Sequence, residues 1–279
     1  MTSRTSGAPE TFQPHRGMGR QITSRDAARR STRLRPSVIL SAVIDEDFGR
    51  MFRTTVNTGG TNPRIHLMFN EWWRHAPDEV VRAYVDTLTA DPDLADLVSG
   101  AQWASPVNLD DLVGLPDGSF GRAYCDWIAD NDLNPRIAGD YERWHMELAA
   151  AGELDDMPEP IRHAVVRLFQ THDFQHLVTG YGSCPQGEIA MFAFCLAQIR
   201  FPYFAMWVSA MTADICFVQP ELIEPMMDAI ADGWQLGRSV GNIQAERWEE
   251  MLAEPLGEVR ARYGITPTPL ARSLAALPS

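Results

Sequence analysis

The chain has 279 residues, of which 45% are hydrophobic and 22% are charged, and its formal net charge is −13. This balance is typical of a globular protein with a substantial core, and the acidic charge argues against a general nucleic-acid binder. All 24 basic residues are arginine, so the sequence excludes every site that needs a lysine, such as a Schiff-base lysine or a phosphate-binding loop with its lysine.

The first 36 residues differ from the rest in charge. They hold eight arginines against only Glu10 and Asp26, whereas residues 37–279 carry a net charge of −19. The segment is rich in Ser, Thr and Gly and has no apolar run, which predicts a disordered tail before a single domain at 37–279. Leaders rich in Arg and Ser and poor in acids also resemble organelle transit peptides, and a third use would be attraction to anionic lipid headgroups.

Apolar residues recur at helical spacing along most of this domain. Residues 78–90 show this helical spacing of apolar side chains, and Asp91-Pro92 ends the pattern. The same reasoning predicts helices over 119–131, 138–150, 160–180, 221–236 and 242–263. The sequence has no alternating strand pattern and no Asn-Gly hairpin turn, so it predicts an all-α fold. The four cysteines form no CxxC pair, which indicates a reduced, intracellular setting.

Residues 189–218 form the longest apolar stretch. Polar residues interrupt it at Gln198, Arg200 and Asp214, so it lacks the run of about 18–20 uncharged apolar residues that a membrane span needs. Pro202 should separate two helices near residues 200–201. The pair can be two buried core helices, the wall of a channel for a long apolar ligand, or a surface that docks on a bilayer.

The candidate lipid-contacting side chains of this stretch are Phe192, Phe201, Phe204 and Trp207, which supply large apolar surfaces. Arg200 is a further candidate because it interrupts an apolar sequence. Three roles are open for its guanidinium group. It can extend along apolar surface to an aqueous interface, pair with Asp214, or bind a carboxylate or phosphate headgroup.

The chemistry concentrates at His172, Asp173 and His176. At roughly 100° per residue, both imidazoles of the helix 160–180 fall on its buried stripe, and Asp173 lies on the flank of that stripe. Imidazoles aimed into a core are costly to leave without partners. Histidines four residues apart on a helix are also the arrangement that offers two nitrogen ligands to one metal ion.

Glu188 is a candidate fourth ligand. The stretch after Gly180 predicts a turn, and Ser183 is expected to cap a new helix, with Gln186 as its capping-box partner. Glu188 then faces back toward the histidines if the two helices are antiparallel. Two imidazoles and two carboxylates suit zinc, and also manganese or ferrous iron. Hydrogen-bonded histidines without any metal are the alternative at this point.

Three sequence blocks resemble one known family. His172-Asp173-x-x-His176, followed after eleven residues by Glu188, resembles the HDxxH-x11-E signature of the coenzyme Q biosynthesis protein 4 homologues. The segment at 115–135, which reads LPDGSFGRAYCDWIADNDLNP, and the segment at 245–265, which reads AERWEEMLAEPLGEVRARYGI, resemble two further blocks of that family. The resemblance covers roughly two-thirds of the chain, from about residue 80 to residue 265.

The resemblance implies an all-α protein of ubiquinone synthesis that binds isoprenoid lipid in an apolar channel. It implies a peripheral membrane protein that assembles with other enzymes of the pathway, and we expect a homodimer. The implied activity is oxidative removal of the C1 carboxylate from a polyprenyl-hydroxybenzoate. By position, the implied metal ligands are His172, Asp173, His176 and Glu188, and zinc is the expected metal, with iron or manganese as alternatives.

Two other functions remain open. The protein can be a non-catalytic lipid-binding scaffold, because a site with four protein ligands can be structural. A phosphohydrolase of the HD type would instead use His145, His172, Asp173 and Asp214. The absence of lysine favours a bacterial protein on the cytoplasmic face of the inner membrane. The leader favours a protein on the matrix side of the mitochondrial inner membrane.

Overall fold

The computed structural model describes residues 46–57, 71–100, 107–131, 133 and 137–277, with the side chains of residues 137–141 left aside. The tail predicted over 1–36 and the start of the predicted domain lie outside these residues. Within the described part, every regular element is helical, and the one isolated β-bridge joins Ser119 to Pro255. The all-α prediction is therefore confirmed.

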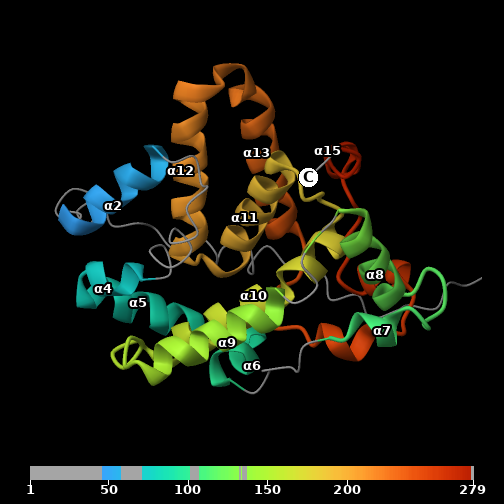
Figure 1. The fold of residues 1–279 in the computed structure, drawn as a ribbon, viewed down its shortest axis with the longest axis horizontal. Helices are drawn as coiled ribbons and strands as arrows, with labels where there is room; N and C mark the ends of the chain where they lie inside the picture. Colours follow the sequence, from blue (N-terminus) through green and yellow to red (C-terminus); the bar gives the residue numbers. More distant parts are fainter. Residues whose placement is uncertain (1–45, 58–70, 101–106, 132, 134–136, 278–279) are drawn as a thin grey trace, which may run out of the picture. The chain divides into compact units, whose positions relative to one another are not determined.

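The chain begins with a series of short and medium helices (Figure 1). In order they are α2 (Glu46–Asn57), α4 (Trp72–His75), α5 (Asp78–Thr89), the 3₁₀ helix η1 (Pro92–Leu94), α6 (Ala95–Ser99), α7 (Leu109–Leu112), α8 (Phe120–Asp130) and α9 (Ile137–Ala150). The helices predicted over 78–90, 119–131 and 138–150 agree with α5, α8 and α9 to within one residue at each end.

Four long helices follow and contain about half of the buried hydrophobic residues. They are α10 (Glu159–Thr179), α11 (Pro185–Ile199), α12 (Pro202–Val218) and α13 (Ile223–Ser239), with the 3₁₀ helix η2 (Pro220–Leu222) between the last two. The chain ends with η3 (Trp248–Met251), α14 (Leu256–Arg262) and α15 (Pro269–Leu274). Figure 1 shows α12 and α13 running antiparallel, joined at one end by a short connection. No helix among the described residues is long and apolar enough to cross a membrane.

The most extensive helix pair is α11 with α13. Two glycines of α13, one turn apart, make this close approach possible. A Cβ added at Gly233 would lie 2.0 Å from the carbonyl oxygen of Ala190, and one at Gly237 would lie 2.6 Å from that of Phe194. The two helix backbones therefore touch directly, and no side chain larger than hydrogen fits at Gly233 without moving a helix.

Two predicted features of the α10–α11 region are confirmed and a third is wrong. Gly180 ends α10 in the left-handed conformation, with φ 84°, and Pro202 begins α12 after a break at residues 200–201. Ser183 does not cap α11, because the helix begins one residue later, with Cys184 as its N-cap residue and Pro185 in the first turn. The Ser183 hydroxyl instead donates to the side-chain oxygen of Asn131, at 2.7 Å.

The single helix predicted over 242–263 is also wrong. Pro255 has no amide hydrogen to continue a helix, and it separates η3 from α14. Side chains from α10 and α14 join this segment to α10. Arg167, which is 1% exposed, forms a two-pronged ion pair with Glu249 at 2.6 and 2.9 Å. Arg260 donates to the carbonyl oxygens of Leu177 and Val178 at the end of α10.

Candidate metal centre

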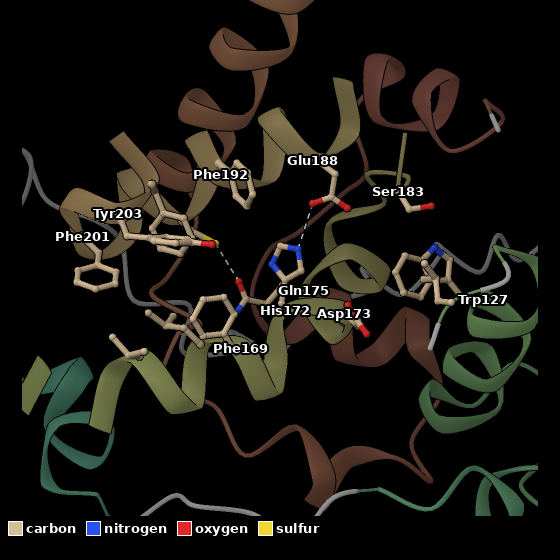
Figure 2. Close-up of a pocket in the computed structure, with 15 residues that line it drawn as sticks. Trp127, Phe169, His172, Asp173, Gln175, Ser183, Glu188, Phe192, Phe201 and Tyr203 are labelled. Carbon is tan, nitrogen blue, oxygen red and sulfur yellow. Dashed lines mark hydrogen bonds and ion pairs between the residues drawn. The ribbon is translucent and has the colours of Figure 1, made fainter. Parts of the chain in front are cut away.

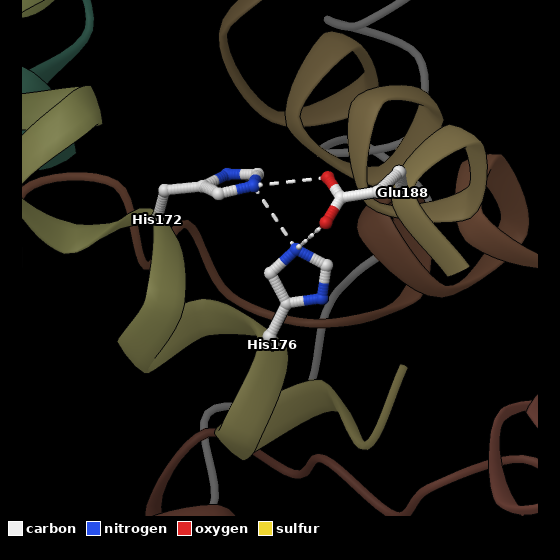
Figure 3. Close-up of side chains that lie close together, drawn as sticks. All are labelled: His172, His176 and Glu188. Atoms are coloured by element: carbon white, nitrogen blue, oxygen red, sulfur yellow. Dashed lines mark hydrogen bonds and ion pairs between the residues drawn. The ribbon is translucent and has the colours of Figure 1, made fainter. Parts of the chain in front are cut away.

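His172, His176 and Glu188 converge where α10 faces the start of α11 (Figure 3). The Nε2 atoms of the two histidines lie 3.0 Å apart. Glu188 reaches both rings, with Oε2 3.2 Å from Nε2 of His172 and Oε1 3.3 Å from Nε2 of His176. One ligand atom from each residue therefore lies within 4.8 Å of the others, close enough for a single cation to contact all three.

The position of His176 also fixes its protonation pattern. Its Nδ1 lies 3.2 Å from the backbone carbonyl oxygen of Tyr181. A carbonyl oxygen only accepts, so Nδ1 carries a hydrogen and the lone pair of neutral His176 is on Nε2, which faces His172 and Glu188. A ring nitrogen that donates to a backbone carbonyl is the usual way in which a metal-binding histidine is held in one orientation.

The donor set fits a divalent cation. Two imidazole nitrogens and one carboxylate form the three-ligand set of many catalytic zinc sites, in which a fourth position stays open for water or substrate. Mixed nitrogen and oxygen donors also suit iron and manganese. His176 is fully buried, whereas His172 and Glu188 are 24% and 32% exposed, so the open side of the cluster is accessible from the pocket described below.

The electrostatics of the cluster favour an ionised Glu188 beside a protonated His176 when no cation neutralises the carboxylate. Burial alone would raise the pKa of Glu188, but the charges and hydrogen bonds of His176 and His172 hold that pKa well below its usual range. Burial alone would lower the pKa of His176, and Glu188, Asp173 and the Tyr181 carbonyl raise it above its usual value. A bound cation must displace the proton from Nε2 of His176, so the affinity for the cation falls as the pH falls.

Asp173, the fourth predicted ligand, is not part of this three-residue cluster. One residue after His172, its side chain is rotated by about 100° around α10. It lines the same pocket, and Figure 2 shows its carboxyl group apart from that of Glu188. Burial raises the pKa of Asp173, the two histidines oppose that shift, and Glu188 adds to it. Asp173 therefore holds a proton more readily than an ordinary aspartate.

An apolar pocket of about 240 Å³ opens beside the cluster (Figure 2). His172, Asp173, Ser183 and Glu188 line its polar part. Its aromatic lining consists of Trp127, Phe169, Phe192, Phe201, Tyr203 and Phe204. A pocket with a few converging polar groups and an otherwise apolar lining is the usual form of a small-molecule site.

Three of the five predicted lipid-contacting residues line this pocket, namely Phe192, Phe201 and Phe204. Trp207 does not line it; its ring packs against Phe192, with 5.6 Å between the ring centres. Arg200 does not line it either. It is exposed at the end of α11, with φ 55°, and forms no ion pair with Asp214 or any other described residue. Arg200 and Asp214 stand near opposite ends of α12, which explains why they do not meet.

A sequence model of the family described as coenzyme Q (ubiquinone) biosynthesis protein Coq4 matches residues 103–269. This chain belongs to the Coq4 family. All four predicted ligands lie inside the matched residues, and the predicted resemblance is confirmed. Family membership connects the chain with ubiquinone biosynthesis.

Two relatives illustrate the similarity of this Coq4-family chain to other proteins. The mitochondrial ubiquinone biosynthesis protein coq-4 of Neurospora crassa is 25% identical over 170 residues, which are 60% of this chain and 44% of that protein. The mitochondrial COQ4 homologue of Bos taurus is 27% identical over 187 residues, which are 66% of this chain and 65% of that protein. The chain thus spans about half the length of several curated relatives that it matches.

A crystal structure from Nostoc punctiforme, of a protein named for ubiquinone biosynthesis, has the same fold. The TM-score is 0.63 at 24% sequence identity, and the match covers 80% of this chain and 99% of the other. The likeness supports the arrangement of the helices. The alternative phosphohydrolase grouping is not formed, because neither His145 nor Asp214 belongs to the cluster of possible metal ligands found among the described residues.

Sequence reasoning missed Trp127 of the Coq4-family chain. Its ring stacks on that of His176, with 5.6 Å between the ring centres and 22° between the planes, and it lines the pocket. Asn131, the residue that follows α8, donates to the Trp127 carbonyl oxygen and accepts from Ser183. The only sequence signal for Trp127 is its place in the 115–135 block.

A second feature missed from the sequence is a buried amide pair in the wall of the pocket, which Gln175 lines. The side chains of Gln175 and Gln244 donate to each other at 3.2 and 3.1 Å. The Cys195 thiol donates to Gln175 at 3.2 Å, and burial raises the pKa of that thiol. Because each amide is satisfied by the other, this group supports the wall of the pocket rather than offering hydrogen bonds to a ligand.

Proposed function

We propose that this Coq4-family protein is a metal-dependent enzyme of ubiquinone biosynthesis. In the proposed reaction, a polyprenyl-hydroxybenzoate loses its C1 carboxylate and gains a hydroxyl group at that carbon. The observation that carries the proposal is the cluster of His172, His176 and Glu188 at the polar end of an aromatic-lined pocket. This arrangement would place a charged head group at the cluster and an apolar tail among aromatic rings.

The residues around the pocket have different proposed roles, according to their positions. His172, His176 and Glu188 would hold the cation, for which we propose zinc, with iron or manganese as alternatives. When bound, a divalent cation supplies Lewis-acid stabilisation of negative charge on a carboxylate or phenolate oxygen. Phe192, Phe201 and Phe204 would contact the prenyl tail and exclude water from it. Asp173, with its raised pKa, is suited to exchange a proton with the phenol or with the product.

The proposed reaction needs an oxidant. The bond between C1 and the carboxylate breaks and releases carbon dioxide, and a carbon–oxygen bond forms at C1. With water as the source of the hydroxyl oxygen, two electrons and two protons must leave, and we propose dioxygen as their acceptor, which is released as hydrogen peroxide. Zinc has no redox chemistry of its own, so with zinc the dioxygen would react with the electron-rich phenolate directly.

A non-catalytic lipid-binding scaffold that organises the ubiquinone enzymes is the second candidate. The observation that favours it is the placement of all three ligands on two helices joined by a five-residue turn, Gly180–Cys184. A cation there would tie α10 to α11 and serve as a structural clamp.

We propose the mitochondrial inner membrane, on its matrix side, as the location, because relatives of this chain are named mitochondrial. The cytoplasmic face of a bacterial inner membrane is the alternative. In either setting the proposed partners are a polyprenylated aromatic lipid, a membrane surface and other ubiquinone biosynthesis enzymes, and the proposed assembly is a homodimer.

The test is turnover by purified protein reconstituted with zinc, iron or manganese in separate samples. A short-chain prenyl-hydroxybenzoate labelled at its carboxylate is supplied with and without dioxygen, and released carbon dioxide is measured. We expect release that requires metal and dioxygen, and its loss together with bound metal in His176→Ala. His75→Ala, on α4 and outside the pocket, is the matched control. Lipid binding without turnover under every metal would contradict the enzyme and favour the scaffold.

A further inference from the structure

We propose that Asp232 on α13 is a positioning residue of the metal centre, because it anchors the turn whose carbonyl group orients His176. The inference rests on the proposed metal-dependent function and adds a residue that contacts neither the cluster nor the pocket. Asp232 is half-buried, and its role is to hold a neighbouring residue in place without taking part in proton or electron transfer.

Two hydroxyl groups converge on one carboxylate oxygen of Asp232. The Tyr181 hydroxyl donates to Oδ2 at 2.6 Å, and the Thr268 hydroxyl donates to the same atom at 2.7 Å. Hydrogen bonds to an ionised acceptor are about twice as strong as neutral ones. Burial, followed by this hydrogen bond, raises the pKa of Tyr181, so its hydroxyl stays protonated and remains a donor.

Tyr181 links this anchor to the metal ligands. Its side chain is 1% exposed, and its backbone carbonyl oxygen accepts the Nδ1 hydrogen of His176 at 3.2 Å. The residue stands just after Gly180, which turns the chain in the left-handed conformation at the end of α10. Tyr181 lies in the turn between α10 and α11. The bond from its side chain to Asp232 therefore helps to fix the position of its carbonyl group, together with the packing of Gly182 against Leu274 and Ala275.

The same point of α13 also contacts the helix that carries Glu188. Gly233, the neighbour of Asp232, lies against the carbonyl oxygen of Ala190 so closely that a Cβ there would come within 2.0 Å of it. Ala190 is two residues beyond Glu188 on α11. Consecutive residues of α13 therefore hold the His176 side of the cluster through Tyr181 and the Glu188 side through Ala190. This double contact sets the distance between the two ligands.

The test compares Asp232→Ala and Tyr181→Phe with wild type and with Asp228→Ala. Asp228 is the matched control, because it lies one turn earlier on α13, is exposed and forms no hydrogen bond or ion pair with any described residue. Cobalt(II) is the probe. Its affinity is measured by competition with a coloured chelator, its ligand geometry by the visible absorption spectrum, and the fold of each metal-free variant by circular dichroism.

We expect Asp232→Ala and Tyr181→Phe to bind cobalt about tenfold more weakly than wild type, with an altered visible spectrum, as for other residues that orient a metal ligand. Asp228→Ala should have the same cobalt affinity and visible spectrum as wild type. Folded Tyr181→Phe with wild-type affinity and spectrum would overturn the inference, even if Asp232→Ala failed to fold. Wild-type protein that binds no cobalt, zinc, iron or manganese would overturn the metal-dependent function itself, and the positioning role with it.

Discussion

At the scale of single residues, position around one helix separates the roles of neighbouring side chains. His172 and His176 are one turn apart on α10 and meet at 3.0 Å, whereas Asp173 faces a different part of the pocket. The neighbouring residues of this motif thus divide into two candidate metal ligands, His172 and His176, and one half-buried acid, Asp173. The raised pKa of Asp173 and the lowered pKa of Glu188 show how differently two carboxyl groups of one pocket behave.

Asp173→Asn tests this division. Because the carboxyl group lies outside the ligand cluster, we expect the variant to keep the metal content of wild type, measured by elemental analysis. Turnover should fall by about 10²–10⁴-fold if the group transfers a proton. Loss of metal comparable to that in Glu188→Gln would instead show that Asp173 is a ligand.

His145 is expected to make stability depend on pH. Burial, with the charges of Arg162 and His163, lowers its pKa to about 4. Between about pH 6.5 and 4 the unfolded chain binds a proton at this residue that the folded chain does not, so stability rises with pH in this range and is lost as the pH falls. When the pH is lowered from 7 to 4.5, we expect the free energy of unfolding of His145→Asn to fall by about 2 kcal/mol less than that of wild type.

Chemical denaturation of both proteins at the two pH values measures this difference. The comparison isolates His145, because the buried carboxylates change equally in both proteins. An equal loss of unfolding free energy in wild type and variant would contradict the role of His145.

At the scale of helices, the closest pair in the described part is held by glycines rather than by large side chains. The backbones of α11 and α13 touch at Gly233 and Gly237. This approach brings α13 near enough to anchor Tyr181 through Asp232. The sequence of α13 is that of an ordinary amphipathic helix. In the structure, it determines the position of the first turn of α11, which carries Glu188.

Gly233→Ala should destabilise the fold and Gly257→Ala should not. The added Cβ at Gly233 would clash with the Ala190 carbonyl oxygen at 2.0 Å, so α13 must shift, at a cost of about 3 kcal/mol. Gly257, on α14, has nothing within 4 Å of an added Cβ, and alanine there gains up to about 1 kcal/mol in helix propensity. Urea denaturation measures both. Equal stabilities would contradict the close contact.

At the scale of the molecule, the C-terminal segment supports the helices that carry the candidate metal ligands. Arg167 and Glu249 pair near the middle of α10, and Arg260 caps its end. Thr268 bonds to Asp232, and Pro267 packs on Gly180. The candidate metal centre therefore depends on residues from 167 to 268, and it should be coupled to the stability of this whole region.

Metal binding should raise the melting temperature. A cation that binds only the folded protein adds about 2.7 kcal/mol at a free concentration of 100 times its Kd, which corresponds to about 5–10 °C for a chain of this size. Calorimetry of zinc-loaded protein before and after chelation measures the shift, with His176→Ala as the control that should show none. A melting temperature unchanged by chelation, in protein that had carried zinc, would contradict the assigned ligands.

The sequence by itself determined the helical fold class, the helices α5, α8, α9 and α10, the break at Pro202 and the family. It also placed His172, His176 and Glu188 in one candidate site, because helical periodicity and ligand spacing are local properties that 3.6 residues per turn translate into geometry. The tertiary structure decided which residues from distant segments complete that site. Trp127, Tyr181 and Asp232 meet around His176 only after packing, and no local pattern marks them. Packing also decided the pairing of Ser183 with Asn131, since the two residues lie 52 positions apart in the chain. The break at Pro255, in contrast, follows from a local property of proline.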